Sequence, residues 1–310
     1  MKIIIAPPVA IWEQGNRKNQ EDNIYPPEGK ATEEDKLFIL CDGMGGHERG
    51  EVASSLVCDS LSSYIWEHWD GKGFTDTILL DALNATMDDL DMLNDDSDKR
   101  PGTTLVVLIF HDDGAFAAHI GDSRIYHIRP ASHEILYKSR DHSQVYDMLA
   151  SGEITVEEMK RYSKKNIITR ALLPGLERRP KPSVVHIADI KPGDYFYLCS
   201  DGMLEQMSDA ELVKLFRKDI SDEKKAQLLI NLTKDNQDNH SAYLIRISGV
   251  LSEENDDKLK DDEKESPANA LNLERQAMRQ VKHQTVKETK RSNKSGVFQH
   301  IKSFIKGLFK

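Results

Sequence analysis

The chain has 310 residues, a length that suits one large domain or two small ones. It carries 42 Lys and Arg against 52 Asp and Glu, a formal net charge of −10, and 38% of its residues are hydrophobic. The acidic balance argues against a nucleic-acid-binding body, because phosphate contacts need clustered basic side chains. Cys41, Cys58 and Cys199 form no CxxC pair, which argues against a disulfide framework or a cysteine zinc site and suits a reducing cytosol.

The charge is distributed unevenly along the chain. Residues 1–248 hold 42 acidic and 29 basic side chains, a net charge of −13, whereas residues 249–310 have a net charge of +3. We predict one domain over 1–248, a charged and mostly disordered linker over 249–296, and a basic amphipathic helix over 297–310. No apolar run is long enough to predict a signal peptide or a transmembrane helix.

The first half of the chain predicts strands and two long helices. The apolar run 1–6, ended by Pro7, predicts an edge strand. Apolar residues at helical spacing predict a helix over 51–68, and a second helix is predicted over 75–93. Asp112, Asp113 and Gly114 predict a tight hairpin turn. Short apolar runs predict strands over 36–41, 104–110, 115–120 and 124–128.

The second half predicts shorter helices and further strands. Ser208 and Glu211 form a capping box that predicts the start of one helix, and Thr155 and Ser221 head similar patterns. The predicted helices cover 142–151, 155–162, 208–216 and 221–232. The predicted strands cover 183–187, 195–199 and 242–247. Strands in runs and helices in pairs favour an α+β fold over an alternating parallel sheet.

Acidic residues stand beside glycine or asparagine where predicted strands end. The pairs are Glu21-Asp22, Asp42-Gly43, Gly121-Asp122, Asp201-Gly202 and Asp238-Asn239. Glycine lets the backbone turn close to a ligand, and oxygen ligands suit Mg²⁺ or Mn²⁺ rather than zinc. Such groups can hold two ions about 3.5–4 Å apart, the arrangement that activates water for phosphoryl hydrolysis. A single Asp-Gly pair more often marks a turn, so the prediction depends on the whole set.

These acids belong to seven motifs that occur in a recognisable order. The motifs are Arg17-Lys18-Asn19-Gln20-Glu21-Asp22-Asn23, Asp42-Gly43-Met44-Gly45-Gly46-His47, Gly102-Thr103-Thr104, Gly121-Asp122-Ser123-Arg124, Asp141-His142-Ser143, Ser200-Asp201-Gly202 and Asp238-Asn239. With them, residues 10–248 resemble the metal-dependent PP2C-type (PPM) protein serine/threonine phosphatases in a short, bacterial-like form. The resemblance implies a four-layer α/β/β/α sandwich of two antiparallel sheets flanked by helix pairs.

The resemblance also implies ligands for the first two ions. Asp42 resembles the carboxylate that bridges two Mn²⁺ or Mg²⁺ ions, and the carbonyl of Gly43 would be a further ligand. Asp201 and Asp238 resemble the other direct ligands of one ion.

The remaining motif residues resemble groups that act around these ligands. Asp22 and Glu21 would act on the second ion, directly or through water. Asp122 is similar to the residue that helps to hold a third, weaker metal in bacterial members. Arg17 resembles the guanidinium that grips the substrate phosphate, for which its forked donors are suited.

The implied activity is hydrolysis of phosphoserine and phosphothreonine by an activated water, without a covalent phospho-enzyme. The alternative is a non-catalytic pseudophosphatase that binds phosphoproteins. Such proteins lose ligand carboxylates, whereas Asp42, Asp201 and Asp238 are present here together with Arg17, so the enzyme is favoured. Expected substrates are phosphoproteins made by a serine/threonine kinase; no nucleic-acid partner is expected, and we expect a cytoplasmic monomer.

Met44 is a departure from some eukaryotic relatives, which have a histidine directly after the Asp-Gly pair to protonate the leaving alcohol. A thioether cannot donate a proton, so this step would use a metal-bound water, another histidine, or no donor at all. His47 is close in sequence, but we favour a structural role as a helix cap. His142 also suits a structural hydrogen-bonding role.

Two basic segments leave alternatives open. The stretch after Asp141 corresponds to the flap region of the family, and it either binds substrate or forms an ordinary solvated surface. Together with Arg140, its basic residues are Lys160, Arg161, Lys164, Lys165 and Arg170. Segment 297–310 has apolar residues on one helical face and lysines on the other, and residues 274–310 have a net charge of +8. This segment predicts a peripheral membrane anchor or a helix that binds a protein groove, in preference to packing on the domain.

Overall fold

The structure, a computed structural model, describes residues 1–45, 49–94, 100–162, 167–205 and 207–251. The chain divides into a unit Met1–Glu253 and a second unit, Glu254–Lys310. The predicted helix 297–310 lies outside the described residues, as does the predicted linker 249–296 apart from its first residues, which continue a strand to Leu251. Among the described residues, no helix is long and apolar enough to cross a membrane.

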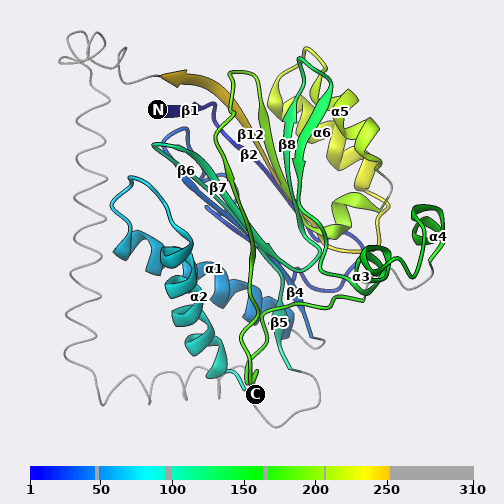
Figure 1. The fold of residues 1–310 in the computed structure, drawn as a ribbon. Coiled ribbons are helices and arrows are strands. Elements are labelled where there is room, and N and C mark those ends of the chain that lie inside the picture. The colour runs from blue at the N-terminus through cyan, green and yellow to red at the C-terminus, as the bar shows by residue number, and fades with distance from the viewer. Residues whose placement is uncertain (46–48, 95–99, 163–166, 206, 252–310) are drawn as a thin grey trace. The chain divides into compact units, whose positions relative to one another are not determined.

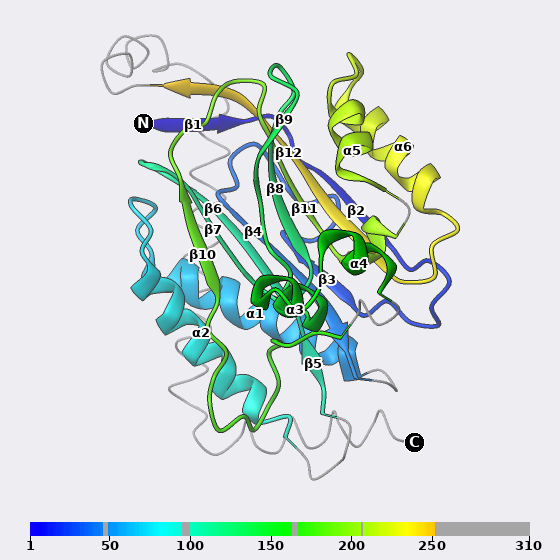
Figure 2. The same ribbon diagram turned by 45° about the vertical axis from the view of Figure 1, so that its right-hand side comes forward.

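The first sheet is antiparallel and runs in the order β10-β7-β6-β4-β3, with β5 also paired to β4 (Figures 1 and 2). Its strands are β3 (Asp22–Tyr25), β4 (Leu37–Met44), β5 (Gly102–Thr103), β6 (Leu105–His111), β7 (Gly114–Ile120) and β10 (Ser183–Ile187). β6 and β7 pair up to His111 opposite Gly114, so Asp112 and Asp113 form the predicted tight turn.

The second sheet is also antiparallel and runs in the order β1-β12-β11-β8-β9, with β2 also paired to β12. Its strands are β1 (Lys2–Ile5), β2 (Val9–Glu13), β8 (Arg124–Arg129), β9 (Glu134–Lys138), β11 (Tyr195–Cys199) and β12 (His240–Leu251). β1 lies at the edge of this sheet, as predicted. β2 pairs with the first half of β12 and β1 with its second half.

Helix pairs cover the outer faces of both sheets (Figures 1 and 2). The helices are α1 (Arg49–His68), α2 (Asp76–Asp91), α3 (Gln144–Ser151), α4 (Val156–Arg161), α5 (Asp209–Phe216) and α6 (Asp222–Thr233). α1 and α2 pack on the first sheet, and α5 and α6 pack on the second. The predicted α/β/β/α sandwich is therefore confirmed, with α3 and α4 apart from both helix pairs.

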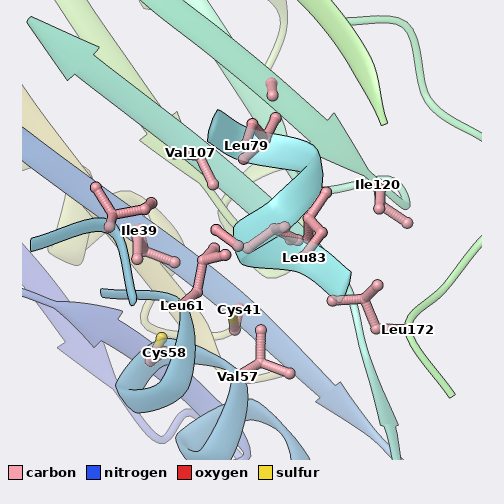
Figure 3. Packing of buried hydrophobic residues seen from close by; sticks show 14 of the residues in the cluster. Ile39, Cys41, Val57, Cys58, Leu61, Leu79, Leu83, Val107, Ile120 and Leu172 are labelled. Atoms are coloured by element: carbon pink, nitrogen blue, oxygen red, sulfur yellow. The ribbon is translucent and has the colours of Figure 1, made fainter. Parts of the chain in front are cut away.

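Three buried apolar clusters lie between the four layers of the sandwich and hold them together. The strand β4 contributes side chains to two of these clusters. Leu37, Ile39 and Cys41 face α1 and α2, where they form part of a buried cluster (Figure 3). Phe38 and Leu40 point the opposite way, into the cluster between the two sheets. This alternation is the two-residue period of a strand that is buried on both faces, as its apolar run predicts.

Four short strands were not predicted. β5 (Gly102–Thr103) has only two residues, and the other three have apolar runs of four residues or fewer, bounded by proline or polar residues. β2 follows Pro8 and ends at exposed Glu13. β3 begins with Asp22, and β9 is bounded by Glu134 and Lys138. Polar residues are common on edge strands, where they oppose pairing with another molecule. The predicted capping box of α5 is present in full, as is the one that begins at Thr155.

The three cysteines are buried and unpaired. Burial raises the pKa of the Cys199 thiol to about 12, and burial together with the neighbouring Cys41 raises the pKa of Cys58 well above its ordinary value. Since the thiolate is the reactive form, neither thiol is suited to nucleophilic chemistry.

We predict that Phe38→Ala lowers the free energy of unfolding by about 3–5 kcal/mol, because it leaves a cavity between the sheets. Phe38 is fully buried there and contacts Phe110 and Tyr243 edge to face. Urea denaturation followed by circular dichroism measures the change. Leu232→Ala, at an exposed position of α6, is the control and should change stability by less than about 0.5 kcal/mol. Equal effects of the two substitutions would contradict the assignment of the core.

Candidate active site

Two carboxylates lie directly opposite each other on neighbouring strands of the first sheet. Asp22, the first residue of β3, pairs in register with Asp42 on β4, so both side chains project from the same face of the sheet. Asp22 is buried, and its Oδ2 accepts a hydrogen bond from the Ser200 hydroxyl at 2.9 Å. Because Ser200 directly follows β11, this bond joins the ends of the two sheets.

Two threonines fix the backbone of Asp42. The Asp42 N–H donates to Thr104 Oγ1 at 3.0 Å, and the Thr104 N–H donates to the Asp42 carbonyl at 2.9 Å. The Thr103 hydroxyl donates to the same carbonyl at 2.9 Å. The position of the carboxylate is therefore set by the main chain as well as by its own rotamer.

Gly43 lies where the end of β4 meets the start of α1. A Cβ atom at this position would lie 2.3 Å from the carbonyl oxygen of Gly50 and 2.5 Å from that of Glu21, so only glycine fits. The Glu21 carboxylate accepts a hydrogen bond from the Gly50 N–H in the first turn of α1. Glu21 thus lies at a helix N-terminus, where the helix dipole stabilises negative charge.

Asp201 and Asp238 lie at one end of the second sheet. Asp201 begins the short 3₁₀ helix η1 (Asp201–Leu204) just after β11, and Asp238 precedes β12, the antiparallel neighbour of β11. The Asp238 N–H donates to Glu205 Oε1 at 3.3 Å, and the Asn239 N–H donates to Asp238 Oδ1 at 2.8 Å. The loop before β12 is therefore held to the end of η1.

The side chain of Asn239 ties the N-terminal motif to the same place. Its Oδ1 accepts from the Glu21 N–H at 2.9 Å, and its Nδ2 donates to the carbonyls of Gln14 and Asn19 at 2.8 and 2.9 Å. These bonds span the loop that carries Arg17. The pair Asp238-Asn239 thus supplies one acidic residue to the site and one amide side chain that holds the N-terminal loop in place by hydrogen bonds.

Arg17 reaches across to the second sheet. Its Nη2 lies 2.6 Å from Asp238 Oδ2, while the side chain stays about half exposed at 51%. The guanidinium has five N–H donors, so this ion pair leaves donors directed elsewhere.

Asp122 lies in the turn between β7 and β8. Its side chain is buried, and its Oδ1 has no hydrogen-bond partner among the described residues. Next to this turn, Arg124 donates to both oxygens of Asp141, at 2.6 and 2.7 Å. The guanidinium of Arg124 is therefore used by Asp141.

Asp42 is the centre of the acidic cluster. Burial raises its pKa well above the ordinary value, and Asp22, Asp201, Asp122 and Asp238 raise it further in that order. Four carboxylates from separate segments thus lie close enough to oppose the ionisation of the residue predicted to bridge two ions.

The surrounding acids are affected in the same way. Burial raises the pKa of Asp22 to about 7, with added repulsion from Asp201 and Asp238, although hydroxyl hydrogen bonds oppose the shift. Burial and Asp201 raise the pKa of Asp122 to about 7. Burial and Asp238 raise that of Asp201 to about 6. The shifts share two causes, which are burial, the larger one, and the negative charge of neighbouring carboxylates.

The chemistry of this cluster fits hard divalent cations. Its donors are carboxylate and carbonyl oxygens, and Asp122 Oδ1 and Asp201 Oδ1 are buried with no partner among the described residues. As they stand, no three of the described acidic, histidine or cysteine side chains enclose a point that would hold an ion. The residues are therefore gathered around Asp42 but need side-chain adjustment to close a coordination shell.

His142 has the structural role that the sequence favours. Its Nδ1 accepts from the Gly121 N–H at 3.1 Å, and its Nε2 lies 2.8 Å from Ser183 Oγ. Burial, with His119 and Arg170 nearby, lowers its pKa to about 3, so it is not an acid suited to leaving-group protonation. His47, the other candidate, lies outside the described residues.

The basic stretch after β9 is partly engaged within the domain. Arg140 donates to the Tyr146 carbonyl at 2.7 Å, and Arg170 Nη1 lies 3.3 Å from His142 Nε2. Lys164 and Lys165 lie outside the described residues. Some of the positive charge of this stretch therefore supports the fold around the site.

The sequence predicts the acids but indicates no role for the residues that hold them. Ser200, Thr104 and Asn239 occur within the quoted motifs, and Glu205 lies outside them. The available signal for Ser200 and Asn239 is that each of these polar residues stands next to a predicted ligand. Their hydrogen-bond partners could not be predicted from the sequence, because Ser200 and Asp22, for example, are separated by 178 positions.

Comparison with known proteins agrees with this arrangement. Residues 16–234 match the sequence profile of the family described as Protein phosphatase 2C. The chain belongs to this family. Among its protein phosphatase 2C relatives, protein phosphatase PhpP of Streptococcus pneumoniae is 32% identical over 226 residues, which are 69% of this chain and 85% of PhpP.

Solved structures of the family share the fold. The serine/threonine phosphatase PstP/Ppp of Mycobacterium tuberculosis has a TM-score of 0.67 and 28% identity, and the match covers 80% of this chain and 100% of that one. The catalytic domain of PstP in complex with two manganese ions has a TM-score of 0.65 and 28% identity over the same shares.

We predict that Asp22→Asn stabilises the metal-free protein at pH 8 and that this gain shrinks at pH 5. The folded-state pKa of Asp22 is about 7 and the ordinary value is 3.8, so the folded protein binds the extra proton between these values. The stability of the wild-type protein that depends on Asp22 therefore falls as the pH rises through this window.

Urea denaturation in EDTA at both pH values measures the difference between the two proteins. Asp209→Asn, which changes an exposed acid paired with Lys138, is the matched control and should show no gain of this kind. A gain from Asp22→Asn that is equal at pH 5 and pH 8 would contradict the electrostatic account.

Proposed function

We propose that this chain is a Mn²⁺- or Mg²⁺-dependent phosphatase that hydrolyses phosphoserine and phosphothreonine in proteins. The observation that carries the proposal is the convergence of Asp22, Asp122, Asp201 and Asp238 on Asp42. Membership of the protein phosphatase 2C family and the two manganese ions in the PstP structure support it.

Each acid has a role in this proposal. Asp42 would bridge the two ions with help from the carbonyl of Gly43, and Asp201 and Asp238 would bind one of them. When bound, the ions lower the pKa of a water and orient it against the substrate phosphorus. The protein supplies a fixed frame for this chemistry through the main-chain bonds on Asp42.

The other residues complete the proposed site. Asp22 and Glu21 would act on the second ion directly or through water, and Asp122 would help to hold a third, weaker ion. Glu21 suits an indirect role, because its carboxylate is bonded to the Gly50 N–H at the start of α1. The Ser200 hydroxyl donates to Oδ2 of Asp22 and so helps to fix the orientation of this carboxylate.

Arg17 is the proposed phosphate-binding residue. Its guanidinium binds an oxyanion, the Asp238 carboxylate, and is about half exposed, so its remaining donors can meet a phosphoryl group that arrives from solvent. Charge that develops on the phosphoryl oxygens would be stabilised by these donors. Met44 cannot donate a proton and His142 has both ring nitrogens engaged, so we assign no described side chain to leaving-group protonation.

A non-catalytic phosphoprotein-binding role is the alternative. It would need Arg17 but not a cluster of buried acids, which destabilises the folded chain unless it binds cations. The presence of the complete cluster therefore favours the enzyme.

We predict that Asp201→Asn lowers kcat by about 10²–10³-fold, because it removes one direct cation ligand. Hydrolysis of a phosphothreonine peptide with Mn²⁺ and with EDTA measures the change. Asp209→Asn is the matched control and should keep full activity. Undiminished turnover by Asp201→Asn, or wild-type turnover that is equal in EDTA, would rule out the proposed mechanism.

We also propose that the substrates are proteins phosphorylated by a serine/threonine kinase and that the chain acts as a cytoplasmic monomer. A separate proposal is that residues 297–310 attach the chain to anionic membrane surfaces. The net charge of +8 over 274–310 supports membrane attachment, together with the apolar face predicted for 297–310. A protein groove as the binding partner is the competing outcome.

We predict that the full chain sediments with phosphatidylserine vesicles and that residues 1–296 do not. Vesicles of phosphatidylcholine alone should retain much less of the full chain, because the basic segment loses its electrostatic attraction. Phosphatase activity of both forms is the control for folding. Equal sedimentation of the two forms would show that the membrane does not bind through 297–310.

A further inference from the structure

The turn that carries Asp122 is held on one side by Thr104. Gly121 has a φ of +107°, and a Cβ there would lie 2.7 Å from Thr104 Cβ. Ser123 Oγ lies 2.8 Å from Thr104 Oγ1, which also accepts the Asp42 N–H. This side of the turn is therefore locked to Asp42.

His142 holds the other side of the same turn. The Gly121 N–H donates to His142 Nδ1 at 3.1 Å, and the His142 N–H donates to the Gly121 carbonyl at 2.9 Å. Both main-chain groups of Gly121, the residue directly before Asp122, are thus bound by one buried residue.

The same histidine reaches two segments outside the cluster. Its carbonyl accepts from the Thr169 N–H at 2.8 Å, and its Nε2 lies 2.8 Å from Ser183 Oγ on β10. Since an amide N–H can only donate, Nδ1 must be the acceptor, and in the neutral ring Nε2 then carries the hydrogen and donates to Ser183. Arg170 Nη1, 3.3 Å from Nε2, is on this assignment a close neighbour rather than a donor.

Ring stacking fixes the plane of this imidazole. His119, on β7, lies parallel to His142 with ring centroids 4.5 Å apart and an interplanar angle of 9°. His119 Nε2 is in turn 2.8 Å from the Arg140 carbonyl. Rotation of the His142 ring would therefore break contacts on both of its edges and on one face.

We propose that His142 is a positioning residue that places the Asp122 turn and couples it to residues 167–170 and to β10. The inference rests on the proposed function, in which Asp122 holds the weaker ion. His142 acts through the main chain of Gly121, whereas Thr104 links the same turn to Asp42. A change at residues 167–170 would then reach the Asp122 turn first through His142, and Asp42 only through Thr104.

Two substitutions test the hydrogen bonds of the two ring nitrogens of His142 separately. His142→Asn keeps an acceptor near the position of Nδ1, and His142→Gln keeps a polar group near that of Nε2. We expect His142→Gln to lose protection of the Gly121 amide against hydrogen exchange in the metal-free protein. We also expect it to weaken the lowest-affinity Mn²⁺ step in calorimetry by about tenfold. His142→Asn, which keeps the acceptor but loses the hydrogen bond to Ser183, should speed Gly121 exchange by only several-fold and bind Mn²⁺ within about twofold of the wild type.

The controls distinguish positioning from loss of structure. His186→Asn changes an exposed histidine on β10 and should leave both readouts unchanged. The amide of Leu108, in the core of β6, reports whether each variant is folded. If neither His142 variant folds, Ser183→Ala replaces them and should speed Gly121 exchange several-fold.

Unchanged Gly121 protection or unchanged Mn²⁺ affinity in His142→Gln overturns the inference, as does unchanged exchange in Ser183→Ala where that variant is needed. These readouts do not require catalysis. Absence of Mn²⁺-dependent hydrolysis by the wild-type protein would instead count against the proposed function, and Gly121 exchange would still decide whether His142 holds the turn.

Discussion

Repulsion among buried carboxylates is the constraint on which the site depends. Asp22, Asp42, Asp122 and Asp201 have raised pKa values for two shared reasons, burial and the charge of their neighbours. The ion pairs among the described residues give none of these four a basic partner. An arrangement of this kind costs folding free energy, which the rest of the domain must offset and which bound cations would return.

The fold offsets this cost in two ways. Apolar layers on both faces of each sheet supply the stability, since strands such as β4 bury side chains in two clusters at once. Hydrogen bonds to main-chain and side-chain atoms then prevent the acids from moving apart. Thr104 holds Asp42, Ser200 holds Asp22, and Asn239 holds the loop of Glu21. Stability and placement therefore come from different parts of the structure.

This division explains how much the sequence could predict. Buried strands such as β11 and helices with clear caps such as α5 were predicted at or within a few residues of their observed bounds, because their signals are local. Asp42, Asp122 and Asp201 could be predicted because each stands beside glycine at or just after the end of a predicted strand. β2 and β9 could not, since edge strands are specified by their neighbours in the sheet. The hydrogen bonds of Ser200 and Asn239 could not be predicted either, because each joins segments about 180–220 positions apart.

The two arginines near the site show why the cluster keeps its negative charge. Arg124 is bound by both oxygens of Asp141, and Arg17 by the more exposed Asp238. Both guanidinium groups are thereby kept from the buried acids, but the Arg17 pair occupies an oxygen of Asp238, itself a proposed ligand, so a cation that binds there competes with this ion pair. Asp141, which is not a proposed ligand, adds acidic charge near the cluster and holds back a basic group that would neutralise it. The affinity of the site for cations follows from this arrangement as well as from the ligands themselves.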